Sequence, residues 1–264
     1  MRYSRISLHI SWLLCTIFFA LWSPAADHHA AAKYHYTDYV QLYPHVFSYQ
    51  GPPNKRIALT FDDGPDQRYT PQILSILRKK GVHATFFVLG KNVKRYPNIT
   101  RQITKEGHIL GNHSYNHPSL TRVNHDQLLW EVKATEREIT QLTGKRTRFV
   151  RPPYGNLDPT VLMSLGKMGY HVVNWSVDSN DWRSLTKAQV LANIIPHVRP
   201  GSIILQHCAS GGPQENLSGT VAALPSIIDT LRQKGYQFVT IQELFATDIK
   251  TVHAPTRMQL SLHH

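Results

Sequence analysis

The stretch Thr60-Phe61-Asp62-Asp63-Gly64-Pro65 carries two adjacent acids at the end of an apolar run. That run, residues 57–59, predicts a short buried strand. Gly64 and Pro65 then restrict the turn that leads the chain away from the acids. Two buried like charges raise the free energy of a folded chain unless a positive group lies among them. We therefore expect the rest of the sequence to supply a metal ion site or an arginine.

Beyond this stretch, short apolar runs alternate with helical patterns over residues 56–245. The expected strands are 57–61, 84–89, 108–111, 149–150, 170–175, 202–205 and 238–240. The expected helices are 71–80, 99–106, 126–142, 159–168, 187–198 and 221–234. This alternation predicts an α/β protein with a parallel sheet and crossover helices. About seven strands in this length favour a closed or nearly closed barrel, with an open doubly wound sheet as the alternative. No glycine fingerprint follows the first strand, so nucleotide binding is not indicated.

The composition narrows the possible partners. The chain has 264 residues, which suits one barrel-sized domain or two small ones, and its formal net charge is +12. A basic surface is compatible with nucleic acid, an anionic membrane, an acidic polymer such as a cell wall, or no specific partner. No dense basic patch with interleaved aromatic residues is present, which argues against nucleic acid. The two cysteines, Cys15 and Cys208, give no disulfide framework once the first is removed. For Cys208 simple packing is the expectation.

The two ends of the sequence differ from its body. Residues 1–26 resemble an export signal, with Arg2 and Arg5 before the apolar run 6–22 and small residues at 23–25. An uncleaved membrane anchor through residues 6–22 is the alternative, although the run is short and slightly polar for a stable span. Both interpretations predict an exported body: secreted, in the cell wall, or on the outer face of the cytoplasmic membrane. Residues 27–55 are expected to form a linker or a loosely packed lead-in, and residues 246–264 a polar tail. No protein partner is predicted.

Reactive side chains follow five of the expected strands. In an α/β barrel such groups collect at the carboxyl ends of the strands. The groups are Asp62 and Asp63; His113 and His117; Arg151 with Pro152, Pro153 and Tyr154; Asp178, Asp181 and Trp182; and His207. This agreement between strand pattern and chemistry predicts one shared site.

His113 and His117, together with one acid of the pair, would make a three-ligand site with open positions. Such a site suits Zn²⁺ or a similar divalent ion that activates water. On spacing alone, hydrogen-bonded polar histidines remain an alternative. So does a non-haem iron oxygenase, which also uses two histidines and a carboxylate. In those enzymes one histidine and the acid usually lie close in sequence, which is not so here.

Side chains alternate along an extended chain, so one acid is expected to ligate and the other to act as a base. Arg151 is the expected partner of the base, through a fork-shaped charge-assisted contact, with a surface salt bridge as the alternative. His207 suits a general acid because the pKa of imidazole lies near neutrality. Asp181 or Asp178 would orient its ring. Apolar walls would come from Trp182 and Leu205, although a core position for Trp182 is equally compatible with the sequence.

The motif order T-F-D-D-G-P, H-S-x-x-H-P, R-P-P-Y-G, D-x-x-D-W and L-x-H closely resembles the polysaccharide deacetylases, the NodB-like group of carbohydrate esterase family four. The resemblance spans about residues 55–245, so residues 56–245 are taken as the catalytic domain. It implies a distorted (β/α) barrel and metal-dependent removal of acetyl groups from N-acetylated sugars. Zinc is the metal expected first, with cobalt or manganese as alternatives.

The resemblance also implies a role for each motif residue. By that likeness Asp62 is the general base, held by Arg151, and the metal ligands are Asp63, His113 and His117. The remaining implied roles are the Tyr154 backbone N–H as part of the oxyanion site, shaped by Pro152 and Pro153; Asp181 tuning the general acid His207; and Trp182 and Leu205 as pocket walls.

The resemblance leaves the substrate open. Export and a basic body favour the bacterial cell wall, with N-acetylglucosamine or N-acetylmuramic acid of peptidoglycan as substrate. Chitin oligomers come second and acetylated xylan third. A non-catalytic wall-binding barrel is the alternative from another class, and the intact set of acid, base, ligands and arginine argues against it.

Overall fold

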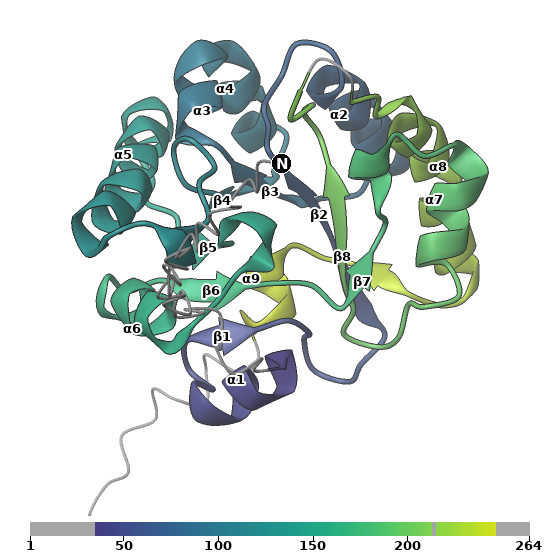
Figure 1. Cartoon of the computed structure of the whole chain (residues 1–264). Coiled ribbons are helices and arrows are strands. Elements are labelled where there is room, and N and C mark those ends of the chain that lie inside the picture. The colour runs from purple at the N-terminus through teal and green to yellow at the C-terminus, as the bar shows by residue number, and fades with distance from the viewer. Residues whose placement is uncertain (1–34, 213–214, 247–264) are drawn as a thin grey trace, which may run out of the picture. The chain divides into compact units, whose positions relative to one another are not determined.

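A computed structural model describes residues 35–212 and 215–246 (Figure 1). Its strands are β1 (Phe47–Ser48), β2 (Arg56–Asp62), β3 (Thr85–Val88), β4 (Ile109–Asn112), β5 (Phe149–Val150), β6 (His171–Val173), β7 (Val177–Asp178), β8 (Ile203–His207) and β9 (Gln237–Phe238). Its α-helices are α1 (Tyr36–Leu42), α2 (Thr70–Lys80), α3 (Gly90–Arg95), α4 (Pro97–Lys105), α5 (His125–Thr143), α6 (Pro159–Lys167), α7 (Lys187–Ile194), α8 (Ser218–Gln233) and α9 (Ile241–Leu244). Three short 3₁₀ turns are η1 (Leu120–Arg122), η2 (Pro153–Gly155) and η3 (Asp181–Arg183).

The parallel strands wind in one direction around a distorted half-barrel. Their order is β1-β6-β5-β4-β3-β2-β8-β7, and β9 pairs with the start of β2. From β2 to β6, each strand pairs with the next one in the sequence. Strand β8 then pairs with the other side of β2, as in the winding of a (β/α) barrel. An open doubly wound sheet would instead reverse direction at a switch point. No strand pairing joins β7 to β1 among the described residues, so the barrel stays open there.

Apolar patterning and helix stops explain the main elements. Six of the seven residues of β2 are buried, as expected for a central parallel strand. Helix α5 begins at the cap Asn124, whose side chain accepts a hydrogen bond from the Gln127 N–H. It ends at Gly144, which has a left-handed φ of 69°. Figure 1 shows the longer helices around the outside of the curved sheet. The largest apolar cluster lies between the sheet and helices that include α2, α7 and α8.

The structure corrects two features of the sequence prediction. Within residues 27–55, the described part is not a loosely packed lead-in: α1 is followed by β1, which pairs in parallel with β6. Phe47 of β1 is buried in a second apolar cluster with Tyr39 of α1. The prediction also lacked α3 and the two-residue strand β7, so the strands exceed the expected seven.

Because the strands are parallel, the carboxyl ends of β2, β4, β5 and β8 lie at the same edge of the sheet. The predicted reactive groups lie at or just after the ends of these strands and of β7, which runs parallel to β8. Within residues 35–212 and 215–246, no helix has the length and apolar character needed to cross a bilayer. The predicted export signal, residues 1–26, and residues 247–264 of the predicted tail lie outside the described residues.

Candidate active site

Asp62 and Asp63 differ in backbone conformation. Asp62 is the last residue of β2, and its side chain is buried. Asp63 has a left-handed φ of 71°. Alternation along an extended chain therefore ends at Asp62, and both carboxylates reach the same histidine. The distances to His113 Nε2 are 3.6 Å from Asp62 Oδ2 and 3.5 Å from Asp63 Oδ1. Side-chain alternation alone therefore does not tell which acid is the base and which the ligand. The neighbours of each carboxylate must distinguish them.

The guanidinium of Arg151 is fully buried and fixes Asp62. Its Nη1 donates to Asp62 Oδ1 at 2.7 Å and to the Thr60 hydroxyl at 2.8 Å. The other guanidinium nitrogens donate to backbone carbonyls on the neighbouring strand β6 and just beyond it. The contact therefore uses one nitrogen, not the fork that the sequence suggested. Burial raises the pKa of the Asp62 carboxyl, and the Arg151 charge opposes that rise.

His113 and His117 converge on the second acid. Asp63 Oδ1 lies 3.5 Å from His113 Nε2 and 3.3 Å from His117 Nε2. His113 Nδ1 lies 2.7 Å from the carbonyl oxygen of Arg151. A carbonyl only accepts, so Nδ1 carries the proton and Nε2 presents its lone pair to the site. The three side chains form the Asp-His-His cluster whose ligand atoms all lie within 4.8 Å of one another.

This cluster fits a divalent metal ion. Asp63 Oδ1 is buried and has no hydrogen-bond partner among the described residues, which is costly without a cation. Burial lowers the pKa of His113 and of His117 to about 3, so both rings are neutral ligands at neutral pH. Burial also raises the pKa of Asp63 to about 7, as expected for a carboxylate that lacks a positive partner. Two imidazoles and one carboxylate are a ligand set that zinc enzymes use.

His207 at the end of β8 lies beside Asp62 in the sheet register. Its Nδ1 is 2.6 Å from Asp181 Oδ1, and its backbone N–H donates to Asp181 Oδ2 at 2.9 Å. Thr220 of α8 also donates to Asp181 Oδ2, at 2.8 Å. Burial by itself would lower the pKa of His207, but the carboxylates of Asp181 foremost, and of Asp63 and Asp62, together raise that pKa to about 10. Asp178, the other acid considered for this position, instead accepts from the Asn180 N–H.

Of the predicted wall residues, Tyr154 contacts this cluster. Tyr154 is 62% exposed, has a left-handed φ of 63°, and its ring packs edge-on against His117 with centroids 4.6 Å apart. Pro152 and Pro153 before it are buried. Trp182 is 52% exposed, which excludes a core position for its ring. Leu205 is buried on β8, in register with Thr60 of β2.

Sequence reasoning missed a buried acid on α5. Glu131 is 1% exposed, and its Oε2 accepts from the backbone N–H groups of Tyr115 and Asn116, both at 2.8 Å. Its Oε1 accepts from the Asn116 side chain at 3.1 Å. A glutamate on the same helix face as the buried Leu128 and Val132 was the available signal.

Cys208 packs beneath the acid-pair turn. Its Sγ donates to the Asp62 carbonyl at 3.4 Å, and a side chain at Gly64 would place its Cβ only 2.3 Å from that sulfur. Gly64 is thus needed for close approach, and the packing expected for Cys208 is what the structure has.

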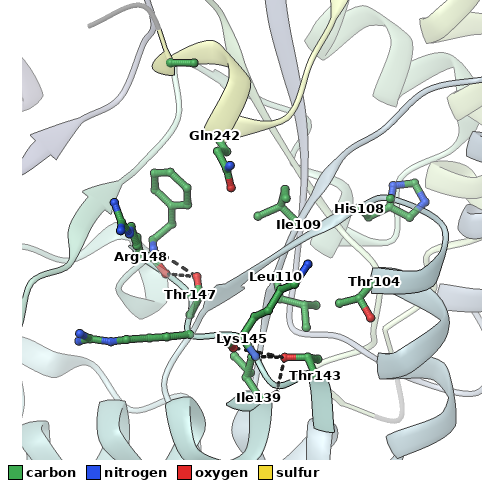
Figure 2. A pocket seen from close by; sticks show the side chains of 14 residues that line it. Thr104, His108, Ile109, Leu110, Ile139, Thr143, Lys145, Thr147, Arg148 and Gln242 are labelled. Atoms are coloured by element: carbon green, nitrogen blue, oxygen red, sulfur yellow. Dashed lines mark hydrogen bonds between the residues drawn. The ribbon is translucent and has the colours of Figure 1, made fainter. Parts of the chain in front are cut away.

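A hollow of about 700 Å³ lies at the opposite edge of the sheet (Figure 2). Ile109 and Phe149, the first residues of β4 and β5, line it. It is therefore separate from the cluster at the carboxyl ends of the strands.

The parallel barrel carries three features at its carboxyl edge: an Asp-His-His cluster, a buried arginine–aspartate pair and a histidine–aspartate pair. Together they are typical of a metal-dependent hydrolase. The polysaccharide deacetylase family model matches residues 49–173. A peptidoglycan-N-acetylglucosamine deacetylase of Bacillus cereus is 43% identical over 210 residues, covering 79% of this chain and 74% of that protein. The chain belongs to the polysaccharide deacetylase family.

Two further similarities agree with this assignment. The peptidoglycan-N-acetylmuramic acid deacetylase PdaA of Bacillus subtilis is 38% identical over 194 residues, covering 72% of this chain and 71% of that protein. The crystal structure of a peptidoglycan N-acetylglucosamine deacetylase in complex with a naphthyl N-hydroxybenzamide superposes with a TM-score of 0.75 at 40% identity. That match covers 79% of this chain and 95% of the other.

Proposed function

We propose that this protein removes N-acetyl groups from N-acetylglucosamine or N-acetylmuramic acid in peptidoglycan. The observation that carries the proposal is the arrangement of the acid pair at the end of β2. Asp62 pairs with Arg151, while Asp63 lies against the two histidines. The relatives from Bacillus cereus and Bacillus subtilis, named for these two sugars, support the substrate class. The net charge of +12 suits an acidic wall polymer.

We propose zinc as the metal, held by Asp63, His113 and His117. When bound, such an ion supplies Lewis-acid polarisation of a carbonyl and acidification of water. Manganese would suit the same ligand set less closely, because it prefers oxygen ligands to imidazole, and cobalt is the other candidate ion.

Asp62 accepts a proton from the attacking water as the water oxygen forms a bond to the acetyl carbon. Arg151 holds the carboxylate in place and leaves Asp62 Oδ2 directed toward His113. The Tyr154 backbone N–H is assigned to the carbonyl oxygen that gains negative charge. His207 then donates its proton to the sugar nitrogen, the carbon–nitrogen bond breaks, and acetate and a free amine leave. Trp182 and Leu205 are assigned to the walls that hold the sugar.

We also propose that residues 1–26 direct export, so that the protein acts on the wall from outside the cytoplasmic membrane. The apolar run 6–22 would anchor it there if it is not cleaved. Fractionation of cells that make the full chain tests this: recovery in the cytoplasm would exclude export.

The decisive experiment incubates the purified protein with muropeptides, with N-acetylglucosamine oligomers and with acetylated xylan, each with and without a chelator. Mass spectrometry then identifies which sugar loses an acetyl group. We expect loss from muropeptides, abolished by the chelator and restored by Zn²⁺. Binding to peptidoglycan without acetate release at any metal concentration would instead favour a non-catalytic wall-binding barrel.

The substitution Asp62→Asn tests the assignment of the base. The amide that it introduces has no basic oxygen but keeps an acceptor for Arg151. We expect kcat for acetate release to fall by about 100-fold or more, the usual contribution of a general base, while the metal remains bound. Full activity of this variant with normal metal content would contradict the role of Asp62.

A further inference from the structure

An aromatic pair, of which Trp130 is exposed and Tyr115 half-buried, lies at the loop that carries the two histidine ligands. Trp130 of α5 is 48% exposed, and its ring meets that of Tyr115 edge-on with centroids 5.2 Å apart. Tyr115 stands midway between His113 and His117 in the sequence. Trp130 is the sixth residue of α5, and in a parallel barrel the start of each helix lies near the carboxyl edge of the sheet. The pair is therefore on the catalytic face.

The pair is rigidly connected to the ligand loop. Glu131, the neighbour of Trp130, is buried and accepts both the Tyr115 and the Asn116 backbone N–H groups at 2.8 Å. On the other side, the Tyr115 ring lies against Gly90 of α3, where a Cβ would come within 2.4 Å of it. The backbone N–H of Lys91 donates to the Tyr115 carbonyl at 3.2 Å. The α5 backbone at Trp130 thus has a fixed position relative to the metal ligands.

The exposed Trp130 ring contacts Tyr115 of the ligand loop, so it adjoins the site and is not an isolated surface residue. The mechanism assigns no role to Trp130. The C–H face of a pyranose ring is apolar while its rim is polar, which matches the apolar face and wet surroundings of an exposed indole. A polymeric substrate carries further sugars beyond the reacting one, and these lie over the surface next to the site.

We propose that Trp130, supported by Tyr115, stacks on a sugar ring of the glycan strand at some distance from the ring that loses its acetyl group. This inference rests on the proposed function. It assigns the surface to the glycan and not to the stem peptides of the wall or to a protein partner.

The test compares Trp130→Ala with the wild-type protein on N-acetylglucosamine oligomers of two and of six sugars, which carry no peptide. We expect KM for the six-sugar oligomer to rise roughly 2- to 10-fold, the range that the loss of one aromatic contact usually gives. Both kcat and the KM for the two-sugar oligomer should stay unchanged, because the lost contact does not involve the reacting group. Trp130→Phe, which keeps an aromatic face, should lie close to wild type.

Met163 of α6 offers a matched control, because it is 50% exposed and outside the site. Met163→Ala should leave KM unchanged for both oligomers. Equal KM values for wild type and Trp130→Ala on the six-sugar oligomer would overturn the inference while leaving the proposed function intact. So would an effect seen only with muropeptides that carry stem peptides. Absence of acetate release by the wild-type protein from every substrate would instead refute the proposed function, and the inference with it.

Discussion

Left-handed backbone conformations surround the acid–histidine cluster. Asp63, Ser114, His117 and Tyr154 all have φ between 63° and 72°, although none is glycine. Each such residue costs on the order of 1–3 kcal/mol, and such costs persist where the surrounding structure fixes them for function. At Asp63 this angle brings the second carboxylate to the same side as the first. This one backbone conformation places the proposed metal ligand beside the proposed base.

The ion pair between His207 and Asp181 determines the pH dependence of the proposed acid. The pKa of His207 is raised to about 10 from its ordinary 6.5, so the ring keeps its proton throughout the neutral range. Asp181→Asn removes the charge that raises this pKa most, while burial continues to lower it and Asp63 and Asp62 still raise it. We expect the alkaline limb of the kcat/KM profile to move about one to three pH units toward neutrality.

The sign of this shift is diagnostic, since a group with a raised pKa loses its proton only as pH rises through that value. A profile of acetate release from about pH 5 to about pH 11 spans the ordinary and the raised pKa and measures it. Thr220→Val, which removes only one hydrogen bond to Asp181, is the control and should move the limb much less. An alkaline limb that stays in place in Asp181→Asn would mean that another group protonates the leaving nitrogen.

At the scale of elements, α5 positions the loop of the two proposed histidine ligands through Glu131. The Glu131 carboxylate accepts from neutral N–H groups only, among the contacts of the described residues. Glu131→Leu would leave the Tyr115 and Asn116 backbone donors without a partner. We expect affinity for Zn²⁺ to fall about 10- to 100-fold, as is typical when a group that supports metal ligands is removed.

Competition with a chelating dye measures this affinity directly, independent of activity. Glu131→Gln is the matched variant, because its oxygen still accepts from the two backbone donors and the Asn116 amide can turn to accept from the new amide nitrogen. It should bind Zn²⁺ within a few-fold of wild type. If Leu and Gln at this position weakened binding equally, the carboxylate charge, and not the acceptor geometry, would be the important property.

The elements differ in how well the sequence predicts them. Helix α5 is long and strand β2 has an apolar centre, so their patterns were clear and their boundaries agree to within two residues. Helix α3 has six residues with only Gly90 and Val93 buried, too few to establish a helical period. Strand β7 has two residues, and only its pairing with β8 defines it. Such pairing is tertiary information that a local pattern does not contain.

The same contrast holds for the site. Strand ends and residue types predicted which side chains would meet, and the structure brings together Asp62, Asp63, His113, His117 and Arg151. The prediction did not include the left-handed turn at Asp63, because an aspartate adopts that conformation only where its surroundings require it. It also missed Glu131 of α5. The role of this residue depends on the loop after β4, which folds back so that the Tyr115 and Asn116 N–H groups reach the Glu131 carboxylate.

At the scale of the whole molecule, the segment before β2 completes the sheet. Strand β1 pairs with the distant strand β6, in the register of Phe47 with Val172, and covers an edge that would otherwise be open. Phe47 is fully buried, and its ring meets Tyr36 and Tyr39 of α1 edge-on. The segment is thus part of the folded body, even though the catalytic motifs begin only at β2.

Phe47→Ala tests this role in stability. Removing a buried phenylalanine typically costs about 3–5 kcal/mol through lost transfer energy and the cavity left behind. We expect that decrease in the free energy of unfolding by urea, with kcat retained below the unfolding transition because the site lies on other strands. Leu42→Ala on α1 is the control: Leu42 is 59% exposed, so its loss should change stability by only about 0.5 kcal/mol. Equal and small effects of the two substitutions would mean that α1 and β1 contribute little to the stability of the barrel, and that the catalytic domain is energetically complete from β2 onward.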